Sequence, residues 1–89
     1  MQRWEYLSVK YKDVYAGYVY CTDPQPILDY LRRSFPTLGT KGVAMVPYGV
    51  GFAGVRILDV MNALGADGWE AVGQFTQVHD AILMKRPVG

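Results

Sequence analysis

The chain has 89 residues, a formal net charge of +1 and a single cysteine, Cys21. This length predicts one domain over residues 1–89, and the lone cysteine excludes a disulfide within the chain. The near-neutral charge disfavours nucleic acid and anionic membranes as partners, and no apolar run reaches the roughly 20 residues that span a bilayer. Because the start of the chain has no secretory h-region, we expect a cytoplasmic protein. Aromatic residues make up 13% of the chain, which predicts a dense core or apolar surface buried between subunits.

Two strands are predicted at the start of the chain. In residues 3–12, Leu7 and Val9 fall on one face, while Trp4 and Tyr6 fall on the other. Because both faces carry large side chains, we expect both to be covered. Lys12-Asp13 predicts a turn, and the tyrosine- and valine-rich residues 14–21 predict the second strand.

A helix is predicted to begin at Asp23-Pro24. The Asp23 carboxylate can accept a hydrogen bond from a free amide, and Pro24 lacks a donor that would be unused at the first helical position. Pro36 ends the helix. Its apolar residues recur at helical spacing and are Ile27, Leu28, Leu31 and Phe35.

Residues 37–54 are rich in glycine. Within them, residues 43–48 predict a short strand, and Pro47 places it at an edge or at its end. The glycines stand at positions 39, 42, 49, 51 and 54.

The clearest helix is predicted over residues 55–67, and Gly68 is placed to end it in the left-handed conformation. Its apolar stripe is Ile57, Leu58, Met61 and Leu64. A strand over residues 69–78, a turn at His79-Asp80 and a last strand over residues 81–86 complete the chain, and Pro87 ends the pairing of that strand.

These elements predict an α+β fold in the order β-β-α-β-α-β-β. We expect a mostly antiparallel sheet of four to five strands with two helices on one face. The adjacency and handedness rules for connections place the last strand between the first strand and the strand that begins at Trp69.

Three short motifs give the chain a resemblance to a known family. They are Trp4-Glu5-Tyr6, the run from Leu64 to Glu70, and Lys85-Arg86-Pro87. In these residues the chain resembles the domain of unknown function 4177 family of small bacterial and phage proteins, over roughly half its length. Asp67 replaces the commoner glutamate of that family. The resemblance implies a core of residues 3–12 and 55–87 and no established activity.

Typical members of that family join the first strand to the helix by a short link. The resemblance therefore implies that residues 13–54 are an insertion. We expect any special function of this chain to lie there.

The pattern Gly-x-Gly-x-x-Gly occurs at residues 49–54, ahead of the clearest helix. Free amides at a helix start can hold a phosphate. A dinucleotide-binding fold is disfavoured, because Glu70 begins the next strand and such a fold needs an acid at that strand's end. A small anion or nucleotide site and a plain glycine loop both remain open, and the shortness of the motif favours the loop. The candidate ligand-binding residues are Lys41, Tyr48, Gly49, Gly51, Phe52, Gly54 and Arg56.

These candidates each have an ordinary alternative role. Lys41 and Arg56 can neutralise a phosphate, although solvated surface charge is the commoner role. Tyr48 and Phe52 can stack on a ring or seal the loop onto the sheet.

Tyrosines recur along the second predicted strand, at positions 15, 18 and 20. Alternating aromatic side chains on a sheet can hold unstacked bases. Without a basic surplus, a packed face or a subunit interface is the favoured interpretation.

Catalytic and metal-binding groups are scarce. Cys21 and His79 do not form a metal-ligand cluster, so we expect neither a metal nor a cofactor. The two can meet as nucleophile and base, but a small buried thiol and a turn histidine are more common. Glu5 and Glu70 can pair with Arg86 or Lys85 across the sheet, which is a structural role.

The leading hypothesis is a non-enzymatic, homo-oligomeric binding protein that can sequester a small anionic, nucleotide-like ligand. The alternative is a protein–protein adaptor or inhibitor that docks a host partner through an aromatic surface. A small enzyme that uses Cys21 or His79 ranks below both.

Overall fold

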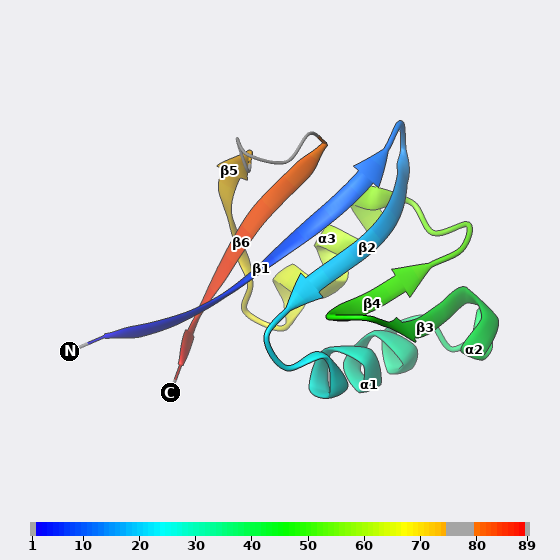
Figure 1. The fold of residues 1–89 in the computed structure, drawn as a ribbon, viewed down its shortest axis with the longest axis horizontal. Helices are drawn as coiled ribbons and strands as arrows, with labels where there is room; N and C mark the ends of the chain where they lie inside the picture. The colour runs from blue at the N-terminus through cyan, green and yellow to red at the C-terminus, as the bar shows by residue number, and fades with distance from the viewer. Residues whose placement is uncertain (1, 75–79, 89) are drawn as a thin grey trace.

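Residues 2–74 and 80–88 of the computed structural model form one six-stranded sheet, two helices and a further four-residue helix (Figure 1). Every strand pairing is antiparallel, which confirms the predicted α+β class. The predicted number of four to five strands is wrong, since the sheet has six. The elements in chain order are β1 (Arg3–Lys12), β2 (Tyr15–Cys21), α1 (Pro24–Ser34), α2 (Gly39–Gly42), β3 (Val43–Val46), β4 (Gly49–Phe52), α3 (Ile57–Ala66), β5 (Glu70–Gln74) and β6 (Ala81–Val88).

The strands are ordered β3-β4-β2-β1-β6-β5 across the sheet. β1 has the predicted bounds and pairs with β2 on one side and β6 on the other. β6 lies between β1 and β5, as the connection rules predicted. Residues 13–54 supply β2, β3 and β4, so the glycine-rich segment is part of the same sheet as the chain ends.

β4 is the strand that the sequence did not predict. Gly49 and Gly51 made this segment resemble a loop, but β4 pairs with β2 on one side and β3 on the other. A side chain at Gly49 would collide with the backbone carbonyl of Val19. Glycine is needed here because two backbones approach closely, which is a packing role and not a flexible-loop role.

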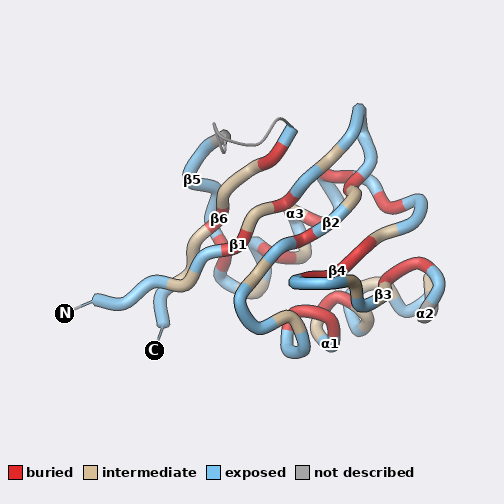
Figure 2. Tube along the Cα trace, in the orientation of Figure 1, coloured by how far each residue is buried: buried red, intermediate tan, exposed pale blue. Residues whose placement is uncertain are grey.

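Both long helices pack on one face of the sheet, and α3 lies behind it in Figure 1. The Tyr30 hydroxyl donates a hydrogen bond to the carbonyl of Ala63 at 2.5 Å, which joins α1 to α3. Figure 2 shows the buried segments gathered where helices and strands meet. No helix within residues 2–74 and 80–88 is long and apolar enough to cross a membrane. The fully buried larger side chains are Leu31, Leu64, Val9, Val19, Val43, Val50 and Val60.

The start of α1 lies where it was predicted, but without the predicted hydrogen bond. Asp23 is the N-cap residue, and its side chain makes no capping hydrogen bond. An N-cap carboxylate accepts from the second or third amide of the helix. The third helical residue is Pro26, which has no N–H to donate.

The predicted apolar stripe of α3 is partly wrong. Ile57 and Leu64 are buried, but Leu58 is 69% exposed and Val60 takes its place in the core. Residues 57, 60, 61 and 64 follow helical spacing, while Leu58 lies about 100° around the helix from Ile57. Gly68 has φ +93° directly after the helix, which confirms its predicted left-handed conformation.

β6 continues past the predicted end at Arg86. Pro87 pairs with Trp4, and Val88 pairs with Arg3. β5 flanks β6 only from Ile82 to Lys85, so Pro87 lies where β6 has a single neighbour and a missing donor is tolerated. The predicted strand segment 75–78 and His79 lie outside the described residues.

Candidate functional site

The structure does not gather the seven predicted ligand residues into one site. Gly49 and Gly51 lie within β4, where their backbone pairs with β2 and β3. A phosphate loop needs amides free of such pairing. The expectation of a glycine loop over residues 49–54 is therefore wrong for residues 49–52, which form β4, while Gly54 lies in the connection to α3.

The other predicted residues lie on separate elements. Lys41 is exposed on α2, and Phe52 packs against the core from the end of β4. Gly54 has φ +74° in the connection that follows β4. Arg56 is exposed at the N-cap position of α3, next to Tyr15 of β2.

Tyr48 lies on the turn between β3 and β4 and is 83% exposed. It lines a shallow hollow of about 330 Å³ together with Tyr6, Tyr20 and Leu83. Of the seven predicted ligand residues, Tyr48 alone lines this hollow.

The hollow belongs to the face of the sheet opposite the helices, which we call the open face. Residues directly opposite one another on neighbouring strands share a face. Ser8 pairs with both Tyr20 and Leu83, and Tyr6 pairs with Lys85, which places these side chains together. The open face consists of Trp4, Tyr6, Ser8 and Lys10 of β1, Tyr18 and Tyr20 of β2, and Leu83 and Lys85 of β6.

The open face is rich in exposed aromatic side chains. Trp4, Tyr6, Tyr18 and Tyr20 are between 39% and 52% exposed. Within the single chain, therefore, nothing covers this face of β1 among the described residues. The rings of Tyr18 and Tyr20 stack with centroids 5.8 Å apart. A side chain at Gly51 would come within 2.9 Å of the Val46 side chain and would lie in ordinary contact with the Tyr18 ring at 3.5 Å.

Of the two lysines on the open face, Lys85 has a compensated charge. The Lys85 ammonium lies 4.1 Å from the centre of the Trp4 ring and 3.6 Å from the Glu70 carboxylate. The sequence left open whether Glu70 pairs with Arg86 or Lys85, and in the structure its partner is Lys85. The ammonium is held by a ring face and a carboxylate, so it is poorly placed to bind an anion.

Cys21 is partly buried at the end of β2, and its environment affects its reactivity. Burial raises the pKa of its thiol, and the negative charges of Asp23 and Glu5 raise it further. A neutral thiol is a weak nucleophile. Its proposed partner His79 lies outside the described residues. Within residues 2–74 and 80–88, no three His, Cys, Asp or Glu residues are grouped to hold a metal ion.

Comparisons of the chain with protein-family models, curated proteins and solved structures find no match. The resemblance to the domain of unknown function 4177 family therefore stays a prediction.

Proposed function

We propose that the protein is a non-enzymatic binding protein that works as a homo-oligomer, with the open face as the contact between copies. The observation that carries this proposal is the row of exposed aromatic side chains on the face opposite the helices. Aromatic residues are enriched in the cores of subunit interfaces.

The size of the aromatic surface supports this role. Five aromatic side chains are between 39% and 83% exposed on or beside the open face. At about 200 Å² for a whole side chain, they present on the order of 500 Å². A stable interface buries about 800 Å² per partner, which the flanking side chains can supply. These five residues are Trp4, Tyr6, Tyr18, Tyr20 and Tyr48.

The chemistry of the open face suits a second copy of itself. In a two-fold dimer each copy presents the same patch. A tyrosine hydroxyl both donates and accepts hydrogen bonds, so two tyrosine-rich faces can satisfy each other. The compensated charge of Lys85 leaves Lys10 as the one lysine of this face without an ion pair among the described residues, which limits the repulsion between two identical surfaces.

A non-enzymatic role is supported by the state of the one cysteine. The raised pKa of the Cys21 thiol keeps it protonated near neutral pH. This favours binding over nucleophilic catalysis by this side chain.

Sedimentation velocity over a range of micromolar concentrations tests the self-association. We expect the unmodified protein to sediment as a dimer or larger species. A double variant, Tyr18→Lys with Tyr20→Lys, should sediment as a monomer, because each copy then brings two uncompensated charges to the contact.

The matched control is Leu58→Lys, which puts the same side chain on an exposed apolar position of α3, on the helix side of the sheet. It should leave the oligomer unchanged. A monomeric unmodified protein throughout the range, or equal loss of the oligomer in the control, would contradict the proposal.

A further inference from the structure

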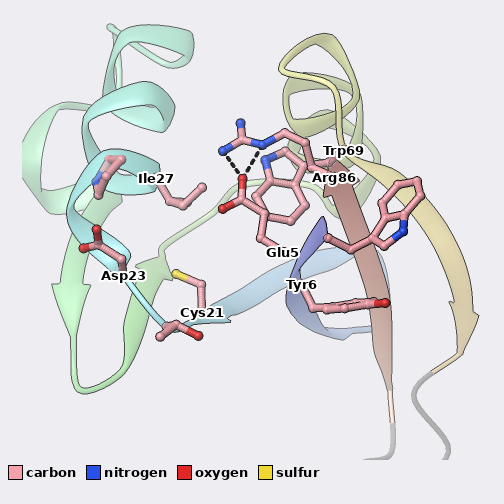
Figure 3. Close-up of a pocket in the computed structure, with 10 residues that line it drawn as sticks. Glu5, Tyr6, Cys21, Asp23, Ile27, Trp69 and Arg86 are labelled. Carbon is pink, nitrogen blue, oxygen red and sulfur yellow. Dashed lines mark hydrogen bonds and ion pairs between the residues drawn. The ribbon is translucent and has the colours of Figure 1, made fainter. Parts of the chain in front are cut away.

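A pocket of about 480 Å³ lies between the end of β2, the first turn of α1 and the paired ends of β1 and β6. Figure 3 shows Cys21, Asp23 and Ile27 on one side and Trp69 and Arg86 on the other, with Glu5 between them. The volume is within the usual range of small-molecule sites. None of the predicted ligand residues lines it, and the proposed subunit contact shares only Trp4 and Tyr6 with it.

The one cation that lines this pocket is already neutralised. The Nε of Arg86 donates to a Glu5 carboxylate oxygen at 2.6 Å, and its Nη1 lies 2.5 Å from an Asp67 carboxylate oxygen. The guanidinium also stacks over the Trp69 ring, 4.5 Å from the ring centre. Two carboxylates on one guanidinium leave this cluster with a net negative charge, although Asp67 itself does not line the pocket.

The opposite wall adds a carboxylate and lacks the usual donors of a helix start. The Asp23 carboxylate makes no hydrogen bond or ion pair with any other residue of the described ranges. Pro24 and Pro26 occupy the first turn of α1, so two of its amides are missing. A helix start normally attracts anions through such amides. This one is poorly equipped to do so.

Trp69 supplies an independent indication that the pocket takes a ligand. Its side chain is 95% buried, and its Nε1 has no hydrogen-bond acceptor. In Figure 3 this nitrogen lies on the side of the ring that is turned toward Ile27. A buried donor without a partner is costly. A ligand oxygen that enters from the pocket would remove that cost.

We infer that this pocket binds a cationic ligand in which a guanidinium or ammonium group stands close to a carbonyl oxygen. The cation faces the carboxylates of Asp23 and Glu5, and the carbonyl accepts the Trp69 N–H. This chemistry occurs in small arginine or lysine derivatives and in a basic residue of a peptide.

The inference is independent of the proposed self-association, although Trp4 and Tyr6 line the pocket and also belong to the open face. Both tryptophans of the chain line the pocket. Intrinsic fluorescence therefore reports binding directly. Titrations on the unmodified protein and on the Tyr18→Lys/Tyr20→Lys variant separate the two proposals, since binding should persist in the variant.

Four probes separate the contribution of the ligand's positive charge to binding from the contribution of its carbonyl group. N-acetyl-arginine amide should bind saturably. N-acetyl-citrulline amide has the same shape without the charge and should bind about tenfold more weakly. Butylguanidine keeps the single guanidinium charge without the carbonyl and should bind about fivefold more weakly. Adenosine monophosphate, an anionic probe, should not bind in this pocket.

Two variants assign the effects to residues. Asp23→Asn should weaken the binding of N-acetyl-arginine amide about fivefold. Because asparagine is an equally good N-cap residue, α1 should persist in this variant. Trp69→Phe should remove the preference for N-acetyl-arginine amide over butylguanidine. Asp59→Asn, on the exposed side of α3, is the matched control and should change nothing.

Equal binding of the arginine and citrulline derivatives, or no binding of either, would overturn the inference. The inference would also be overturned if adenosine monophosphate bound more tightly than the arginine derivative and if Asp23→Asn strengthened that binding. If butylguanidine binds as tightly as N-acetyl-arginine amide, the role of Trp69 is wrong. A library of peptides with and without a basic residue then separates a peptide ligand from a free amine, since a peptide site should bind an arginine-containing peptide more tightly than N-acetyl-arginine amide.

Discussion

Replacing two of the glycines by alanine should have opposite effects on stability, although both glycines lie in regular structure. Gly49 of β4 faces the backbone carbonyl of Val19, whereas Gly65 of α3 has open space around it. Gly49→Ala should lower the free energy of unfolding by about 2–3 kcal/mol, because the backbones must move apart. Gly65→Ala should raise it by about 0.5 kcal/mol, because alanine favours a helix. Urea denaturation of both variants tests the difference, and equal effects would contradict it.

The Cys21 thiol gives a prediction about pH. Because its pKa is raised, first by burial and then by Asp23 and Glu5, alkylation by iodoacetamide should require a higher pH than for a free thiol. A raised folded-state pKa stabilises the fold below the ordinary thiol pKa, and this contribution is lost as the pH rises through the folded value. Mass spectrometry of alkylation rates against pH measures the shift. Asp23→Asn should lower the pKa partway, and an unchanged profile in that variant would contradict this cause.

The ion pairs at the ends of the strands could be predicted from the sequence. Glu5 pairs with Arg86 and Glu70 with Lys85, as the positions beside the two tryptophans indicated. The contact of Asp67 with Arg86 was missed. Asp67 follows α3, and its position beside β6 depends on the turn that Gly68 makes, which local sequence does not determine.

At the scale of elements, α3 provides a matched test of burial. Leu64 is fully buried and Leu58 is 69% exposed on the same helix. Leu64→Ala should lower the free energy of unfolding by about 3 kcal/mol, since it leaves a cavity in the core. Leu58→Ala should change it by about 0.5 kcal/mol or less. Thermal or urea unfolding of the pair checks this, and a comparable loss at Leu58 would place that side chain in a buried contact.

The elements that the sequence predicted well are those with strong local signals. The alternation in β1, the proline at the start of α1 and the glycine after α3 each act within a few residues. β4 and the end of β6 were missed because their pairing depends on neighbours. In the sequence, Gly49 and Gly51 resemble a loop, and only the tertiary structure shows that the backbone of Val19 lies against Gly49. Pro87 resembles a strand end, and only the tertiary structure shows that β5 does not extend far enough to pair with it.

At the scale of the whole molecule, the pocket combines segments that are far apart in the chain. Glu5, Cys21, Asp23, Trp69 and Arg86 come from four different parts of the sequence. No spacing rule connects them, so the candidate site could not be predicted from motifs. The predicted site relied on a contiguous glycine pattern, which the sheet uses for its own packing.

Self-association of the whole molecule should also appear in its thermal stability. If the folded state is an oligomer, its melting temperature should rise with protein concentration, because association stabilises only the folded chain. Differential scanning calorimetry at two concentrations tenfold apart measures this. The Tyr18→Lys/Tyr20→Lys variant should melt at the same temperature at both. A melting temperature of the unmodified protein that is independent of concentration would contradict the oligomer.

The pairing of Arg3 with Val88 brings the beginning and the end of the described chain side by side (Figure 1). A short glycine bridge would therefore close the backbone head to tail without disturbing the sheet. Such a circular molecule loses entropy chiefly in its unfolded state, so it should resist heat better than the linear chain. It would also present no free end to exopeptidases.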